Sequence, residues 1–194
     1  MISPSIRGGC SKVTRRSLSR GALAGGFTQE GLQNHAIRYW NEKQQEPYTD
    51  LFSQKLSAEC TQWLDSHHDP SSELARAFFG SSRFAPERAI MSPFFYSRAH
   101  LPDSFEEKDQ FLAWEVASKT PLELICSWEL LGTKGLTMMA FDAKLRRLYH
   151  GNCVDSLTSK NGVGKALIPF HTHYAKFLLG GMADALEQRA ILKQ

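Results

Sequence analysis

The sequence has few cysteines and no motif that pairs them. Its four cysteines are Cys10, Cys60, Cys126 and Cys153, and no two of them form a C-x-x-C. Such short spacings are typical of structural zinc sites and of thiol redox motifs. We therefore expect free thiols in a reducing compartment, without a disulfide framework.

Long apolar runs are also missing. No stretch approaches the roughly 20 apolar residues that a membrane-spanning helix needs, and the longest uncharged stretches contain Pro, Gly, Ser or His. We therefore expect a soluble protein without a transmembrane segment. The 194 residues are 42% hydrophobic and 22% charged, which is enough for one core without metal or disulfide support.

Acidic residues are absent from the first 29 positions. Five of the 23 basic residues lie there, which leaves 18 basic residues against all 20 acidic ones in the rest of the chain. The body therefore carries a net charge of −2, although the formal charge of the whole chain is +3. Nucleic-acid binding requires a concentrated positive surface, so we expect no nucleic-acid partner.

The basic leader, residues 1–29, has the composition of an organelle transit peptide: it is rich in Ser, Arg, Gly and Ala. We expect it to be disordered and to direct the protein to the mitochondrion, with plastid import or a cytoplasmic protein bearing a basic tail as alternatives. The pair Arg15-Arg16 also suggests a bacterial export signal. The apolar stretch that follows, Gly21–Phe27, is short for such a signal.

The body, residues 30–194, is predicted to form a single domain, because no repeat or change in composition divides it. Its first part alternates helical and extended patterns. The predicted elements are a helix over Gln29–Lys43, a strand over Tyr48–Leu56, a helix from the N-cap Ser57 to Ser66, a helix over Glu73–Phe79 capped by Ser71 or Ser72, and a strand starting at Phe94-Phe95-Tyr96. An acidic connection, Pro102–Asp109, follows.

The second half of the body predicts an antiparallel meander. From Phe111 to Cys153, apolar residues recur with a period of two between turn sequences such as Thr120-Pro121 and Asp142-Ala143-Lys144. Both faces of the segment Leu136–Phe141 are apolar. We therefore expect this strand to lie centrally in the sheet, with the last helix covering one of its faces.

That last helix is predicted from Pro169 to about Gln188, after a polar loop over Asp155–Lys165. With a 3.6-residue period, one side carries Phe170, Tyr174, Phe177, Leu178, Gly181 and Ala185, and the other carries Thr172, Lys176, Ala183 and Glu187. We expect the first side to be buried. The predicted class is α+β, with a curved antiparallel sheet packed on a long C-terminal helix.

Six short segments resemble one family of sequences. They are Trp114-Glu115-Val116, Thr120-Pro121, Glu123-Leu124, Trp128-Glu129, Arg147-Leu148-Tyr149 and Pro169-Phe170-His171. Over roughly residues 46 to 188, the chain is similar to a domain-of-unknown-function family within the START and polyketide-cyclase-like (SRPBCC, helix-grip) superfamily. Compared with that family, the chain has an insertion over Gly151–Ile168. The resemblance implies a helix-grip fold with an apolar cavity between sheet and helix, and no established activity.

Six residues are expected to contact a ligand in that cavity: Trp114, Trp128, Met138, Tyr149, His171 and Tyr174. The tryptophans and the methionine would form apolar walls, and the histidine and tyrosines would supply polar contacts. The expected ligand is an apolar small molecule or a lipid. The sequence does not predict the oligomeric state.

Catalytic motifs are weak. His171 and Tyr149 are the two candidates for acid–base chemistry, since no serine nucleophile motif occurs. The acids expected within strands, Asp50, Glu115, Glu123 and Glu129, are predicted to face solvent.

Neither a metal nor a nucleotide is expected. His150, Cys153 and His171 lack the spacing of a zinc site. The segment Gly162–Ala166 is not a phosphate loop, because Ser159 replaces its first glycine and Ala166 its final hydroxyl residue. We expect no cofactor.

Three classes of function remain open. The first is a module that binds an apolar small molecule or lipid. The second is an enzyme of the cyclase or dehydratase type that uses a pocket His and Tyr. The third is a non-catalytic assembly protein, for which an exposed apolar patch without a cavity is the expected feature.

Overall fold

Six strands form one curved, unclosed antiparallel sheet in the order β1-β6-β5-β4-β3-β2. The computed structural model describes residues 27–40, 47–130, 132–155 and 162–193. The strands are β1 (Tyr48–Lys55), β2 (Gln110–Phe111), β3 (Trp114–Thr120), β4 (Glu123–Leu130), β5 (Thr133–Asp142) and β6 (Arg147–Val154). The predicted meander is β3 to β6, and β1 pairs with its last strand. The α+β class is confirmed.

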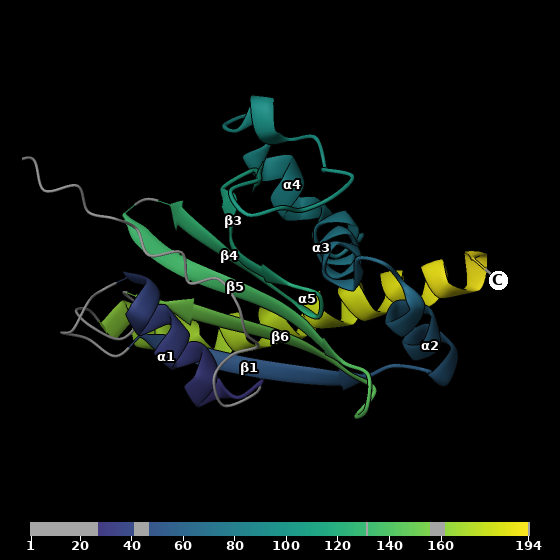
Figure 1. Cartoon of the computed structure of the whole chain (residues 1–194). Helices are drawn as coiled ribbons and strands as arrows, with labels where there is room; N and C mark the ends of the chain where they lie inside the picture. The colour runs from purple at the N-terminus through teal and green to yellow at the C-terminus, as the bar shows by residue number, and fades with distance from the viewer. Residues whose placement is uncertain (1–26, 41–46, 131, 156–161, 194) are drawn as a thin grey trace, which may run out of the picture.

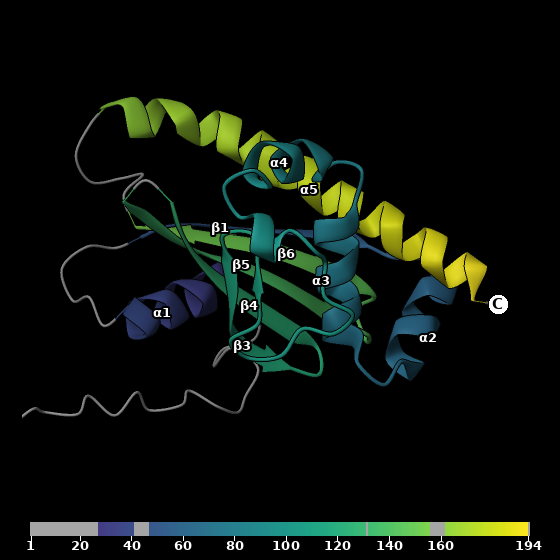
Figure 2. The same cartoon turned by 90° about the horizontal axis from the view of Figure 1, so that it is seen from above.

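Helices cover both faces of this sheet. The helices are α1 (Gln29–Trp40), α2 (Ala58–Ser66), α3 (Pro70–Gly80), α4 (Ala85–Met91), the 3-10 turn η1 (Tyr96–Arg98) and α5 (Gly162–Leu192). Helix α1 lies on one side of the sheet, and α5 lies on the other with α3 and α4 (Figure 1; Figure 2). The predicted helix-grip-like arrangement, a curved sheet against a long C-terminal helix, is confirmed.

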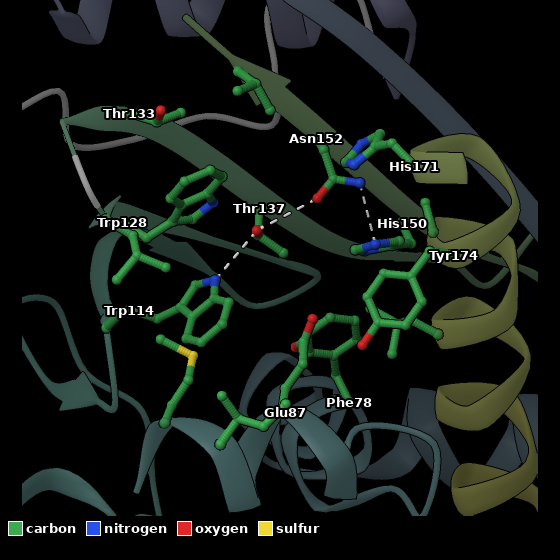
Figure 3. A pocket seen from close by; sticks show the side chains of 17 residues that line it. Phe78, Glu87, Trp114, Trp128, Thr133, Thr137, His150, Asn152, His171 and Tyr174 are labelled. Atoms are coloured by element: carbon green, nitrogen blue, oxygen red, sulfur yellow. Dashed lines mark hydrogen bonds between the residues drawn. The ribbon is translucent and has the colours of Figure 1, made fainter. Parts of the chain in front are cut away.

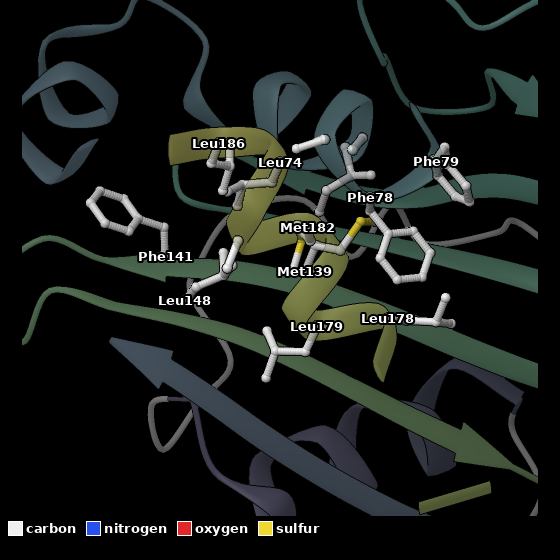
Figure 4. Close-up of a cluster of buried hydrophobic side chains, with 14 of the residues drawn as sticks. Leu74, Phe78, Phe79, Met139, Phe141, Leu148, Leu178, Leu179, Met182 and Leu186 are labelled. Carbon is white, nitrogen blue, oxygen red and sulfur yellow. The ribbon is translucent and has the colours of Figure 1, made fainter. Parts of the chain in front are cut away.

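The alternation of side chains along β5 separates two cores. Met139 and Phe141 belong to the larger core, which the sheet shares with α3 and α5 (Figure 4). Met138 and Ala140 belong to a smaller core beneath α1. Because successive strand residues point to opposite faces, an apolar run of this length requires cover on both sides. The predicted central position of this strand is confirmed by its pairing with β4 and β6.

The buried side of α5 differs from the predicted one. Among residues 168–192 of this helix, seven apolar side chains are buried: Ala175, Leu178, Leu179, Met182, Ala183, Leu186 and Ala190. Phe170 is 70% exposed and Phe177 is 47% exposed, so their predicted burial was wrong, as was the predicted exposure of Ala183. The stripe is rotated because small and aliphatic residues, rather than aromatic ones, allow the helix to approach the sheet closely.

Three predicted boundaries also need correction. Helix α5 begins at Gly162 and contains Pro169, so the predicted start at Pro169 was wrong. The expected insertion over Gly151–Ile168 is divided between the end of β6 and the start of α5, and residues 156–161 lie outside the described part. The segment Phe94-Phe95-Tyr96 leads into η1 rather than into a strand.

The helix caps show why α2 and α3 begin where they do. Ser57 caps α2 as predicted, since its Oγ accepts a hydrogen bond from the Cys60 N–H at 3.0 Å. Helix α3 begins at Pro70 after the cap Asp69, whose carboxylate accepts from the Ser72 N–H, so the predicted serine caps were wrong. Proline suits a first helical turn because its missing N–H would have no partner there.

The leader, apart from its last three residues, and Cys10 lie outside the described residues. The predicted helix at Gln29–Lys43 is described as far as Trp40. Within the described ranges, none of the helices combines the length and the apolar character needed to cross a bilayer.

Candidate functional site

A pocket of about 470 Å³ lies between the inner face of the sheet and the helices α4 and α5 (Figure 3). Most of its wall is apolar: Phe78, Ile90, Met91, Ala113, Trp114, Trp128, Leu130, Val154, Ala175 and Leu178. Seven polar residues complete it: Glu87, Thr133, Thr137, His150, Asn152, His171 and Tyr174. This size and this lining are typical of small-molecule sites, which combine apolar walls with a few placed polar groups.

The structure brings four of the six predicted contact residues together in this pocket: Trp114, Trp128, His171 and Tyr174. Met138 and Tyr149 do not line it. They lie on the opposite face of the sheet, where Met138 belongs to the core beneath α1 and Tyr149 packs against that core. Their neighbours along the chain, Thr137 and His150, occupy the pocket instead, because side chains alternate along a strand.

Trp128 owes its place to a glycine on the neighbouring strand. It pairs with Gly135 across β4 and β5, and a Cβ at Gly135 would lie 2.1 Å from the indole ring. The ring therefore lies against the bare backbone of β5. Any side chain at residue 135 would displace this wall of the pocket.

A chain of hydrogen bonds crosses the floor of the pocket (Figure 3). The Trp114 Nε1–H donates to Thr137 Oγ1 at 3.3 Å. Thr137 Oγ1 donates to Asn152 Oδ1 at 3.4 Å. Asn152 Nδ2 donates to Asp50 Oδ1 at 3.1 Å, and lies 3.3 Å from His150 Nε2. Because the Asp50 carboxylate can only accept, the direction of every bond in the chain is fixed.

His150 is neutral in this network. Its Nε2 accepts from Asn152, so the proton must be on Nδ1. That atom has the Met138 backbone as its nearby polar partner, in a geometry short of a hydrogen bond. The imidazole is 1% exposed and packs beside the Phe78 ring. Burial lowers the pKa of His150 to about 4, against a weaker opposing effect of Asp50.

His171 and Asp50 form the second polar feature. His171 Nε2 lies 3.1 Å from Asp50 Oδ2, which is an ion pair when the imidazole is protonated, although the alignment is not that of a hydrogen bond. Tyr48 donates to the same carboxylate oxygen at 3.4 Å. Asp50 is only 6% exposed, so the prediction that it faces solvent was wrong. Glu123 is also buried, whereas Glu129 is exposed and Glu115 is partly so.

Glu87 and Tyr174 form the third polar feature, where α4 meets α5. The two side chains lie close enough for each to affect the pKa of the other. Burial raises the pKa of Glu87, and the Tyr174 hydroxyl opposes that shift. The pKa of Tyr174 is raised by burial and then by the neighbouring carboxylate. Glu87 Oε2 is buried and has no hydrogen-bond partner.

Sequence reasoning missed Glu87, Thr137, His150 and Asn152 as pocket residues. A usable signal existed for two of them, because Thr137 and Asn152 are polar residues at inward positions of otherwise apolar strands. They are also direct partners in the β5–β6 register. Glu87 gave no such signal, since its place depends on how α4 packs across the open end of the sheet.

Metal and thiol chemistry find no support in this part of the chain. No cluster of three His, Cys, Asp or Glu that could hold a metal ion occurs among the described residues. His150 and Cys153 point to opposite faces of β6, so they cannot share a ligand. Cys60, Cys126 and Cys153 are free and buried. Burial raises the pKa of Cys60 and of Cys153 to about 12, which keeps both as unreactive thiols.

Comparisons with known proteins do not identify a family for this chain. No family model matches the chain. No curated protein and no solved structure is significantly similar to it.

Proposed function

We propose that this protein binds an apolar small molecule or lipid in the pocket between its sheet and α5. The observation that carries the proposal is the pocket itself: about 470 Å³, with ten apolar residues among those that line it. An apolar hollow of this size leaves apolar surface unburied that a packed core would cover, which lowers stability. A site that binds a ligand gives a reason for keeping that space.

Two further points support the proposal. The polar residues of the floor are already bonded to one another, so an apolar ligand can cover them without leaving many groups unpaired. The resemblance of the sequence to START-related proteins suggests the same kind of ligand. Burying about 300 Å² of apolar ligand surface would contribute about 7 kcal/mol before the cost of association.

Binding can be tested with an environment-sensitive hydrophobic dye and by mass spectrometry of the solvent-extracted protein. We expect one saturable dye site and a co-purifying apolar compound. Filling the pocket should abolish both, and Ala113→Phe places an aromatic ring at its wall. Ala58→Phe adds the same ring to the exposed side of α2 and should leave binding intact. Absence of a saturable site in the parent protein would favour the assembly role instead.

The pair His171 and Asp50 favours one second candidate, an enzyme that moves a proton on a ligand in the pocket. A buried carboxylate 3.1 Å from the imidazole can orient it and stabilise its protonated form. Tyr149 takes no part, because it lies on the other face of the sheet. An apolar ketone such as 2-decanone is a suitable probe. The enzyme hypothesis predicts deuterium exchange next to its carbonyl, and loss of that exchange in His171→Gln without loss of dye binding.

We propose in addition that the leader, residues 1–29, directs the protein to the mitochondrion. Its support is compositional: five basic residues and no acidic one. Fusing these residues to a fluorescent protein should bring the fusion to mitochondria. A fusion that enters plastids or stays in the cytoplasm would contradict this.

A further inference from the structure

The lining of the proposed ligand pocket contains an acidic residue but no lysine or arginine among the described residues. That acidic residue is Glu87. The remaining titratable groups of its wall are His150, His171 and Tyr174. His150 stays neutral at physiological pH, because burial lowers its pKa to about 4.

Three basic side chains of the surrounding elements are engaged elsewhere. Arg83 pairs with Asp184 at 2.6 Å, and its guanidinium lies over the Phe177 ring. Arg88 donates to the Phe79 carbonyl. Lys176 lies over the Phe52 ring on the exposed side of α5. None of these cations faces the space that a ligand would occupy.

A second carboxylate lies behind the wall. Asp50 accepts from Asn152 and Tyr48, and it faces His171 at 3.1 Å. It is 6% exposed, so water screens its charge poorly. The fixed charges nearest the pocket, apart from a protonated His171, are therefore negative. A carboxylate or phosphate brought into this pocket would meet like charge, with no lysine or arginine among the described lining residues to offset it.

Part of the hydrogen-bonding capacity of the pocket is already used. The floor is occupied, because Trp114, Thr137 and Asn152 donate to one another and to Asp50. Tyr174 lies beside Glu87. Three buried polar atoms of the lining have no hydrogen-bond partner: Glu87 Oε2, His150 Nδ1 and His171 Nε2. Glu87 is the acidic residue among them, and its ionised carboxylate accepts hydrogen bonds from N–H or O–H groups.

We propose that this pocket selects amphiphiles whose polar end donates hydrogen bonds, an ammonium or a hydroxyl group, and rejects those that end in a carboxylate. The polar end binds at Glu87 beside Tyr174, and the apolar chain lies between Trp114 and Leu178. This assignment rests on the proposed function, since it names the class of ligand for the same pocket.

Three probes with one carbon skeleton test the assignment: decylamine and decanoate, each below its micellar concentration at neutral pH, and 1-decanol below its solubility limit. Isothermal titration of the full chain should give the tightest binding for the amine and the weakest for decanoate. We expect the amine and decanoate to differ by about tenfold or more, the size of a charge-assisted hydrogen bond.

The variant Glu87→Gln tests the residue, because it keeps the shape and removes the charge. It should weaken amine binding about tenfold, change decanol binding less and improve decanoate binding. Glu59→Gln removes an exposed carboxylate from α2 and serves as the matched control, with all three affinities unchanged.

The outcomes distinguish a failure of ligand binding from a failure of the proposed selectivity. If none of the three probes binds, the proposed function fails and this assignment fails with it. If decanoate binds as tightly as the amine, or if Glu87→Gln leaves the amine affinity unchanged, the pocket binds ligands but the proposed selectivity is wrong.

Discussion

The two ends of the interface between α5 and the sheet differ, although one helix and one sheet form both. Toward the C-terminus of α5, Leu179, Met182 and Leu186 belong to one buried apolar cluster with side chains of β5 and β6 (Figure 4). Toward its N-terminus, His171 and Tyr174 face a pocket of about 470 Å³ (Figure 3). The same architecture therefore contains a solid half and a hollow half.

The side chains at each end explain the difference. The solid half joins aliphatic residues from helix and sheet, which fill space in well-defined rotamers. The hollow half joins rigid tryptophans to polar residues held in place by their own hydrogen bonds, such as Thr137 and Asn152. Groups that are already bonded cannot collapse inward to fill a void. The solid half therefore stabilises the fold, and the hollow half is free for binding.

The largest expected effect comes from damaging the solid half. Leu186 is fully buried between α5 and the sheet, so Leu186→Ala should lower the free energy of unfolding by about 3 kcal/mol through lost burial and the cavity left behind. Ile90 lines the pocket and is 69% exposed, so Ile90→Ala should change the free energy of unfolding by less than about 0.5 kcal/mol. Urea denaturation measures both. Equal costs for the two substitutions would contradict the division into halves.

An effect of similar size concerns pH and the polar floor of the hollow half. Since burial lowers the pKa of His150 to about 4 from its usual 6.5, the unfolded chain binds a proton more readily than the folded one. Stability from this group is therefore complete above pH 6.5, falls as the pH drops toward 4, and is constant below that. The total loss should be about 3 kcal/mol.

The variant His150→Gln isolates this contribution, because an amide can still accept from Asn152 and does not titrate. The difference in unfolding free energy between parent and variant should change between pH 6.5 and pH 4 and be constant outside that window. His100→Gln, at an exposed position, is the matched control. A pH profile that His150→Gln leaves unchanged would show that folding does not shift the pKa of this imidazole, and would contradict its burial as a neutral group.

The sequence was sufficient for the fold because its strongest signals are local. Alternation along β3 to β6 identified the meander, and the two apolar faces of β5 identified its centre. The cap Ser57 placed the start of α2, since a serine oxygen meets the free N–H of Cys60 within one turn. Each of these features depends on residues close together in the chain.

The pocket was harder to predict because its residues meet only through packing. Tyr149 was chosen for its chemistry, but strand parity places it beneath α1 and places His150 in the pocket. The alternation of side chains along β6 would have predicted His150 in the pocket if the inward face of this strand had been known. Glu87 comes from a seven-residue helix whose position no local pattern determines. The residue types in the sequence suggested an apolar site, but the packing of the elements determines which residues line it.

The smallest expected effect tests which side of α5 faces the sheet. Hydrophobicity alone would bury Phe170, and then Phe170→Ala would cost about 3 kcal/mol or more. The structure leaves this ring 70% exposed, stacked on Tyr174 at 6.1 Å between centroids, so we expect a change below about 0.5 kcal/mol in the free energy of unfolding. The two orientations of the helix thus predict costs that differ severalfold for one substitution. A large loss of stability in Phe170→Ala would mean that α5 is rotated relative to this structure. Tyr174 and His171 would then not line the pocket, and the hollow half of the interface would not exist as described.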